Sequence, residues 1–427
     1  MDLIPQIIWI GGAVIVVLVA VQGLFFVFGN LRAATHQHQQ RRRELALWDT
    51  RLETARLRQR QAARQQQWAW TGFRKFQVVR KEAESADRSI VSFYLRPHDQ
   101  KPIPGFVPGQ FLTFRLPLPD EPKPLVRCYS LSGAPSLDAE QPDYRVSIKR
   151  VPANPKDSDS RPGRCSNYFH DAVEVGDLLD VKPPSGHFVL DMEKDTPVVL
   201  IGGGVGLTPM MSMLAAVVAH NPQREVWFFY GVRHRDEHAM LPQMRELAAS
   251  PNVHLQVCYS DPREADVAGR DYDHAERISV DLFRRVLPSN NYEFYMCGPG
   301  PMMDALTAGL AEWGVPDSDV HLEAFGPSAP KKKAKTADPA AAGPPVTFRK
   351  SEVTAAWDPS LEHLWEFAQA NDVSIESGCL QGNCGSCETA VLKGKVVYPE
   401  GPPSFEPQAG NCLPCCAKPD GPLELDA

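Results

Sequence analysis

The sequence predicts a multidomain protein with an N-terminal transmembrane helix, an antiparallel β-barrel, an α/β domain with a parallel sheet, and a small α+β domain. Three observations support this fold class. An apolar run fills residues 7–28, short β-like runs give way near residue 195 to alternating strands and helices, and six of the ten cysteines lie between Cys379 and Cys416. With 427 residues, the chain is long enough for about three ordinary domains.

Residues 7–28 form the predicted transmembrane anchor. Gln22 is the only strongly polar residue in this run, and no Lys or Arg precedes it. An α-helix of this length covers roughly the 30 Å apolar core of a bilayer. Arg32 and Arg41 to Arg43 follow the run, so the positive-inside rule places the large C-terminal part of the chain in the cytoplasm. The expected localisation is single-pass in a membrane, with the bacterial inner membrane favoured; a buried helix and a signal peptide stay open as alternatives.

Residues 31–67 are expected to form an Arg-rich helix. Residues 32–67 hold nine Arg and three acidic residues. Such a helix can lie on anionic lipid, pair with a partner or act as a solvated spacer. The whole chain carries a net charge of −7, which argues against nucleic acid as a partner.

Residues 70–190 are expected to form the barrel. Six short runs rich in β-branched and aromatic residues are separated by Pro and Gly, a pattern typical of antiparallel barrels. The runs are FRKFQVV, SIVSFYL, QFLTFRL, VRCYSL, YRVSIKR and DLLDVK.

Residues 195–326 alternate strand-like and helix-like segments, which predicts a doubly wound α/β domain. Residues 327–345 are rich in Pro, Ala and Lys and predict a linker. Residues 346–427 then form a compact module that carries the dense cysteines.

The strongest chemical signal is the spacing of Cys379, Cys384 and Cys387, with another cysteine about 28 residues further on. Four thiolates at this spacing match a plant-type [2Fe–2S] site, in which one loop wraps the cluster and a distant ligand closes it. Glycines between the cysteines allow the backbone to approach the sulfur atoms. Zinc is the alternative, but it favours two close cysteine pairs. From the spacing alone, the fourth ligand stays open among Cys412, Cys415 and Cys416. We therefore expect a β-grasp [2Fe–2S] domain.

A glycine-rich turn follows the first strand of the α/β domain. Gly202, Gly203 and Gly204 precede Thr208, which is a suitable N-cap, and Pro209, which is a suitable first helical residue. The start of such a helix attracts the pyrophosphate of a nicotinamide coenzyme. A purely structural tight turn is the alternative.

The segment Arg127-Cys128-Tyr129-Ser130 resembles the flavin-binding motif of the ferredoxin-NADP reductase superfamily. The resemblance implies that Arg127 binds a flavin phosphate, that Tyr129 packs on the ring system and that Ser130 lies near the flavin N5. The later segment that contains Gly163, Ser166 and Asn167 resembles the pyrophosphate-binding turn of the same superfamily. Lys149 is a further candidate contact.

Three other segments carry the resemblance further. Cys297-Gly298-Pro299 resembles the superfamily's turn beside the nicotinamide, and Arg233 is a candidate contact on the adenosine side. Asp261 would repel a 2′-phosphate, which favours NADH over NADPH. Phe325, in a segment similar to the end of flavohaemoglobin reductase modules, is expected to lie over the flavin ring.

The order of these motifs is similar to that of phthalate-type dioxygenase reductases and hybrid-cluster-protein reductases. The resemblance implies Cys415 as the fourth cluster ligand, FAD rather than FMN, and Ser130 and Cys297 as the catalytic residues. It implies an NADH-dependent reductase that passes electrons through flavin and cluster to an acceptor protein. The predicted anchor suggests a membrane-bound oxygenase, hydroxylase or desaturase as that acceptor. A ferric or quinone reductase and a non-catalytic redox carrier or sensor are the alternatives.

Overall fold

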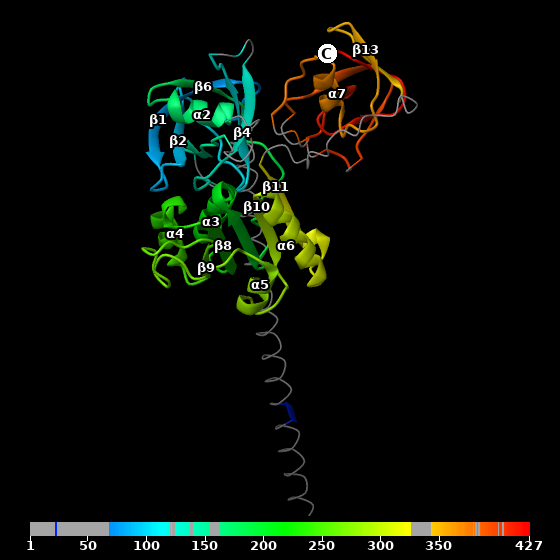
Figure 1. The fold of residues 1–427 in the computed structure, drawn as a ribbon. Coiled ribbons are helices and arrows are strands. Elements are labelled where there is room, and N and C mark those ends of the chain that lie inside the picture. The colour runs from blue at the N-terminus through cyan, green and yellow to red at the C-terminus, as the bar shows by residue number, and fades with distance from the viewer. Residues whose placement is uncertain are drawn as a thin grey trace, which may run out of the picture. The chain divides into compact units, whose positions relative to one another are not determined.

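The computed structural model describes residues 22–23, 68–119, 121, 124–136, 140–153, 162–325, 343–378, 380, 382, 385–399, 401–403 and 405–427. The chain divides into two units, Met1–Gln67 and Trp68–Ala427. The sheets and helices discussed below all belong to the second unit (Figure 1).

The prediction of an N-terminal transmembrane helix is wrong. Within the described part of the chain, none of the helices combines the length and the apolar composition needed to cross a bilayer. This finding also corrects the single-pass localisation with cytoplasmic domains that depended on the anchor. The prediction relied on the length of an apolar run, which a transmembrane helix requires but which does not by itself establish one. Apart from Gln22 and Gly23, residues 7–28 lie outside the described residues, as does the predicted Arg-rich helix over 31–67.

A six-stranded antiparallel sheet forms the first domain, with the strand order β4-β3-β6-β1-β2-β5. An isolated bridge between Leu131 and Val146 joins the two edge strands and closes the sheet into a barrel. All six strands that the sequence predicts are present. They are β1 (Arg74–Ala83), β2 (Ile90–Pro97), β3 (Phe111–Leu116), β4 (Leu125–Ser130), β5 (Tyr144–Lys149) and β6 (Leu178–Val181).

Among the described residues of this domain there is one helix, α2 (Arg164–Asp171), whose apolar side packs into the barrel. Phe169 is fully buried and meets three aromatic rings edge-on. Its ring centroid lies 5.2 Å from Phe93, 5.3 Å from Phe114 and 5.2 Å from Tyr129. Edge-to-face contacts of this kind fix ring orientation, so α2 and strand β4 are held in one arrangement.

The second domain is a five-stranded parallel sheet with the order β11-β10-β7-β8-β9. Alternate residues of β7 face opposite sides: Leu200 packs with α3 and α4, and Ile201 packs with α5 and α6. Both faces are therefore covered, as a parallel sheet requires. The elements are β7 (Val198–Gly203), α3 (Leu207–His220), β8 (Val226–Val232), α4 (Leu241–Ala248), β9 (Val253–Tyr259), α5 (Val280–Val286), β10 (Glu293–Gly298), α6 (Gly300–Glu312) and β11 (Val320–Ala324), with short 3₁₀ turns η1 (Gly204–Gly206), η2 (Arg235–Glu237) and η3 (Asp317–Asp319).

Side chains from the barrel enter the α/β domain. Ile90, Phe188 and Leu190 belong to the same buried cluster as α3 and α4. The backbone N–H of Gly109 donates to Ser212 Oγ at 3.0 Å, and buried Arg145 donates to Gln243 Oε1 at 2.8 Å. These contacts hold the two domains against each other.

The third domain is a mixed sheet with the order β13-β12-β18-β14-β16, packed on one helix. Its first and last strands, β12 and β18, run parallel, as in a β-grasp fold. The elements are β12 (Pro345–Phe348), β13 (Val353–Ala356), α7 (Leu364–Ala370), β14 (Thr389–Lys393), β15 (Val396–Val397), β16 (Asn411–Cys412), β17 (Lys418–Pro419) and β18 (Leu423–Leu425).

Candidate functional site

Strand β4 presents the predicted flavin residues at the mouth of the barrel. Tyr129 is half-buried, and its ring contacts Phe114 and Phe169. Burial raises the pKa of its phenol, so Tyr129 stays neutral. Arg127 is exposed and donates to the carbonyl of Val126 at 2.6 Å. The guanidinium is therefore available to an anionic ligand from solvent.

The start of α2 lies near Arg127. Burial raises the pKa of the Cys165 thiol, and the charges of Arg127 and Arg164 oppose that shift. Gly163 precedes the helix and leaves no room for a side chain, since a Cβ there would lie 2.5 Å from Ser166 Oγ. The buried carboxamide oxygen of Asn167 has no hydrogen-bond partner among the described residues. The exposed cation of Arg127 and the N–H groups at the start of α2 fit the pyrophosphate of FAD. The Asn167 oxygen is an acceptor and would instead receive a hydrogen bond from an N–H or O–H group.

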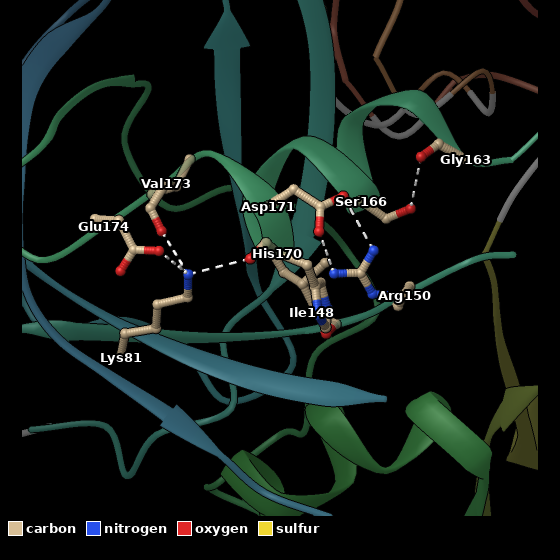
Figure 2. Close-up of polar contacts among 9 residues, drawn as sticks. All are labelled: Lys81, Ile148, Arg150, Gly163, Ser166, His170, Asp171, Val173 and Glu174. Atoms are coloured by element: carbon tan, nitrogen blue, oxygen red, sulfur yellow. Dashed lines mark hydrogen bonds and ion pairs between the residues drawn. The ribbon is translucent and has the colours of Figure 1, made fainter. Parts of the chain in front are cut away.

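Figure 2 shows how α2 is fixed from both sides. Arg150, directly after β5, forms a bidentate ion pair with Asp171, with N···O distances of 3.0 and 2.5 Å. Lys81 Nζ donates to the carbonyls of His170 and Val173 and to the carboxylate of Glu174. Ser166 Oγ donates to the carbonyl of Gly163 at 3.2 Å, within the first turn. The helix that begins at the predicted phosphate site is thus tied to strands β1 and β5.

The predicted coenzyme turn follows β7, but its helix starts earlier than the sequence suggests. Helix α3 begins at Leu207, and its N-cap is Gly206 without a side-chain cap. Thr208 is therefore not the N-cap and Pro209 is not the first helical residue. Thr208 Oγ1 instead donates to the carbonyl of Val205 at 3.0 Å. The 3₁₀ turn η1 shifts the start of the helix and leaves the first N–H groups of α3 beside the glycines.

The turns after β7 and β10 fit into each other. A Cβ on Gly206 would lie 2.0 Å from the carbonyl oxygen of Cys297, and a Cβ on Gly203 would lie 2.8 Å from Pro299 Cδ. A Cβ on Gly298 would meet Met302 at 2.4 Å. The glycines therefore serve close backbone approach, and the structure brings the two motifs together although about 95 residues separate them.

Ser130 of the barrel and Cys297 of the α/β domain meet at a residue that the sequence analysis did not select. Ser130 Oγ donates to Glu323 Oε2 at 3.2 Å, and Glu323 pairs with Cys297 in the β10–β11 register. Burial raises the pKa of the Glu323 carboxyl to about 8, and the Ser130 hydrogen bond opposes that rise. Burial also raises the pKa of the Cys297 thiol, and Glu323 adds to the effect. All three side chains are buried.

The position of Glu323 in the sequence could have identified it as a site residue. It stands two residues before Phe325, in the segment that the sequence analysis assigned to the flavin. Phe325 itself follows β11 and is 44% exposed, so its ring is accessible to a cofactor. Its predicted place over the flavin remains a prediction.

Two further predicted contacts lie on the coenzyme side. Lys149 Nζ is 3.8 Å from the position of a Cβ on Gly204, so this lysine at the end of β5 lies over the glycine turn. The sequence analysis had assigned it to the flavin. Arg233 directly follows β8 and forms an ion pair with Glu237.

The cysteine-rich loop is described in part. Cys379 and Cys384 lie outside the described residues, whereas Cys387 and Cys415 are described and buried. The backbone N–H of Gly382 donates to Cys415 Sγ at 3.3 Å. Gly382 and Gly385 have φ angles of +70° and +65°, and a Cβ on Gly382 would lie 2.8 Å from Cys416 Sγ. Thiols beside left-handed glycines and an N–H···S bond fit an iron–sulfur cluster.

Comparisons with known proteins match three domain families to successive parts of the chain. An oxidoreductase FAD-binding domain family matches residues 75–190, an oxidoreductase NAD-binding domain family matches residues 200–308, and a 2Fe-2S iron–sulfur cluster binding domain family matches residues 346–420. The order along the chain is the order that the motifs predict.

Individual relatives cover different parts of the chain. A flavohemoprotein from Oceanobacillus iheyensis is 41% identical over 266 residues, which is 62% of this chain and 62% of the relative. The chain thus spans less than two thirds of that relative. The FAD/NAD-binding domain of a nitric oxide dioxygenase from Vibrio cholerae is 32% identical, with a TM-score of 0.52, and the match covers 60% of this chain and 100% of that structure.

A third match extends over the cysteine-rich domain. An intact type IV self-sufficient cytochrome P450 monooxygenase matches 83% of this chain and 41% of its own, at 25% identity and a TM-score of 0.57. The chain therefore belongs to the iron–sulfur flavoprotein reductases of the ferredoxin-NADP reductase superfamily, and it is an NAD(P)H-dependent oxidoreductase with FAD, NADH and a [2Fe–2S] cluster as its cofactors.

Proposed function

We propose that this protein takes electrons from NADH and delivers them singly, through its [2Fe–2S] cluster, to an acceptor protein of the oxygenase class. The observation that carries the proposal is the 3.2 Å hydrogen bond from Ser130 to Glu323 beside Cys297. It joins the predicted flavin strand to β11, directly beside the predicted nicotinamide turn, so both rings would meet at one buried point. When bound, FAD accepts hydride from NADH, and the cluster carries one electron at a time.

The residues on the barrel side hold the flavin. Arg127 offers a planar cation to the pyrophosphate, and the first turn of α2 offers N–H groups. Tyr129 supplies an apolar ring that α2 keeps in place through Phe169. Ser130 orients the reactive edge of the ring system through its hydroxyl.

The residues on the α/β side hold the nicotinamide and exclude water. Gly203, Gly206 and Gly298 let the two turns approach each other closely beside Cys297. At neutral pH the Glu323 carboxyl keeps its proton, because its pKa is raised to about 8. A neutral carboxyl and a neutral thiol place no fixed charge beside the rings that would draw water inward.

The acceptor class rests on similarity. The region that matches this chain makes up 41% of a structure described as an intact self-sufficient cytochrome P450 monooxygenase. A ferric or quinone reductase would use the same cofactors and differ only in its acceptor.

Anaerobic stopped-flow spectroscopy of the FAD- and cluster-loaded protein tests the proposal. NADH should bleach the flavin absorbance first and the cluster absorbance second. Ser130→Ala should slow the first phase by roughly tenfold or more, because it removes an orienting hydrogen bond at the reacting edge. Ser92→Ala removes a similarly buried hydroxyl, bonded to Ser147 at 2.6 Å, and should leave the rate near that of the wild type. A flavin that NADH does not bleach would overturn the proposal.

A further inference from the structure

The end of strand β8 is where we expect the protein to distinguish NADH from NADPH, which carries an additional 2′-phosphate. In dinucleotide-binding sheets, the strand after the glycine-turn unit ends beside the adenosine ribose. An acid at that point accepts a ribose hydroxyl, and an arginine there accommodates a 2′-phosphate. In this chain Arg233 directly follows Val232, the last residue of β8.

Arg233 is already engaged by a carboxylate. Its guanidinium forms an ion pair with Glu237, which lies four residues later and is the last residue of the turn η2. The Glu237 side chain is 10% exposed and that of Arg233 is 68% exposed. The hydrogen bond from Arg233 and its charge lower the pKa of Glu237 against the burial that would raise it, so Glu237 stays ionised.

A second acid lies at the same point. The backbone N–H of Asp261, two residues after β9, donates to the carbonyl of Arg233 at 2.9 Å. The hydrogen bond and charge of Glu237 raise the pKa of Arg233, and the charge of Asp261 adds to that rise. A phosphate at Arg233 would therefore meet two carboxylates.

The neighbouring arginines are paired as well. Arg263 pairs with Asp236, and Arg270 pairs with Asp271 at 2.7 Å. Arg235 lies 3.9 Å from the same Asp271 carboxylate. Arg233 and Arg263 thus each pair with a carboxylate of their own, whereas Arg235 and Arg270 share that of Asp271.

We propose that Glu237 makes the protein selective for NADH by holding Arg233 in an ion pair, so that this arginine cannot bind the 2′-phosphate of NADPH. This inference rests on the proposed function, since it assumes that the coenzyme lies along the carboxyl edge of the parallel sheet. Removing the Glu237 charge leaves the five N–H donors of Arg233 available to a phosphate.

Calorimetry of the FAD-loaded full chain tests this with two probes that differ by one phosphate, 5′-AMP and adenosine 2′,5′-bisphosphate. The readout is the ratio of their dissociation constants. Glu237→Gln should shift the ratio toward the bisphosphate by about tenfold or more, the usual size of one new charge-assisted hydrogen bond. Adding Arg233→Gln to that variant should return the ratio to the wild-type value.

Two further variants make the result decisive. Glu246→Gln removes an exposed carboxylate from α4 and should leave the ratio unchanged, which controls for net charge. Arg233→Gln alone should also leave the ratio within about twofold, because Arg233 is already paired.

A ratio that Glu237→Gln does not move, or that Arg233→Gln alone shifts away from the bisphosphate, would overturn the proposal. If 5′-AMP fails to bind any variant, the coenzyme site itself is misplaced and the proposed function fails with it.

Discussion

At the scale of single residues, Glu323 governs how the site responds to pH. Its pKa is raised from 4.5 to about 8 by burial. Between these values the native protein holds a proton that the unfolded chain has released, so stability falls as pH rises. The contribution is fully present below pH 4.5 and is lost as pH passes 8. It amounts to a few kcal/mol in order of magnitude.

Glu323→Gln should therefore flatten the decline in stability between about pH 5 and pH 8. Chemical denaturation of the FAD-loaded protein at several pH values measures this. Glu312→Gln, which changes an exposed carboxylate on α6, is the matched control and should keep the wild-type slope. If both variants show the same slope as the wild type, Glu323 does not hold the proton.

The fourth cluster ligand can be assigned by three single substitutions. Cys415→Ser should abolish the cluster's absorbance and its bound iron, whereas Cys412→Ser and Cys416→Ser should retain both. The N–H of Gly382 points at Cys415 Sγ, whereas Cys412 is fully buried within strand β16. Iron analysis and anaerobic spectra measure the outcome. A cluster that survives in Cys415→Ser but is lost in Cys412→Ser or Cys416→Ser would assign the ligand to the other cysteine.

Most residues of the candidate site lie in short sequence motifs and were therefore predictable. Glu323 was not, because its position depends on the register between two strands. Arg127, Tyr129 and Ser130 lie within four consecutive residues, so their joint placement on one strand follows from the sequence. Glu323 reaches Ser130 only because β11 pairs with β10 in one particular register. Pairing between distant strands is not visible in a local pattern.

At the scale of elements, helix α2 depends on Lys81 at its carboxyl end. The three Nζ donors of Lys81 all find acceptors at that end (Figure 2). Lys81→Met should lower the free energy of unfolding by about 1–3 kcal/mol and weaken FAD binding, because the helix start carries the phosphate site. Lys75→Met on the same strand removes one exposed pair, 2.8 Å from Asp180, and should cost less than about 1 kcal/mol. Thermal melts with and without FAD compare the two; equal losses would contradict this role for Lys81.

The interlocked turns after β7 and β10 give a second test at this scale. Gly206→Ala would place a methyl group 2.0 Å from the carbonyl of Cys297, so it should separate the two turns. We expect a loss of about 1–3 kcal/mol in stability and weaker nicotinamide coenzyme binding. Gly300→Ala is the control, since a Cβ there meets nothing within 4 Å. Melting curves and calorimetry with NAD⁺ measure both effects, and a Gly206→Ala protein that matches Gly300→Ala would refute the argument.

The elements themselves were largely predictable, because hydrophobic period and turn residues are local signals. All six barrel strands were found from alternating or mixed β-branched runs. The start of α3 was misplaced because Thr208 and Pro209 have strong capping preferences, while close packing of Gly206 against Cys297 fixes the helix start at Leu207. Tertiary contact overrode local preference there.

At the scale of the whole molecule, the order of the three domains followed from the order of the motifs. The predicted membrane anchor is wrong, since none of the helices in the described part of the chain could span a bilayer. The composition of one apolar run cannot by itself establish a spanning helix. The placement of distant contacts, such as Lys149 over the coenzyme turn, depends on how domains pack and was not predictable from either domain's motif alone.

The predicted linker over 327–345 sets the last expectation. Its richness in Pro, Ala and Lys predicts a flexible connection, so the cluster domain would move between the flavin and the acceptor. Removing half of this segment should slow reduction of an acceptor protein that draws electrons from the cluster, and it should leave NADH-to-ferricyanide turnover unchanged. The Cys415→Ser variant calibrates the two assays, because only the first one requires the cluster. If the shortened protein keeps the wild-type rate in both assays, electron transfer does not depend on that movement; if both rates fall together, the deletion has damaged the flavin site instead.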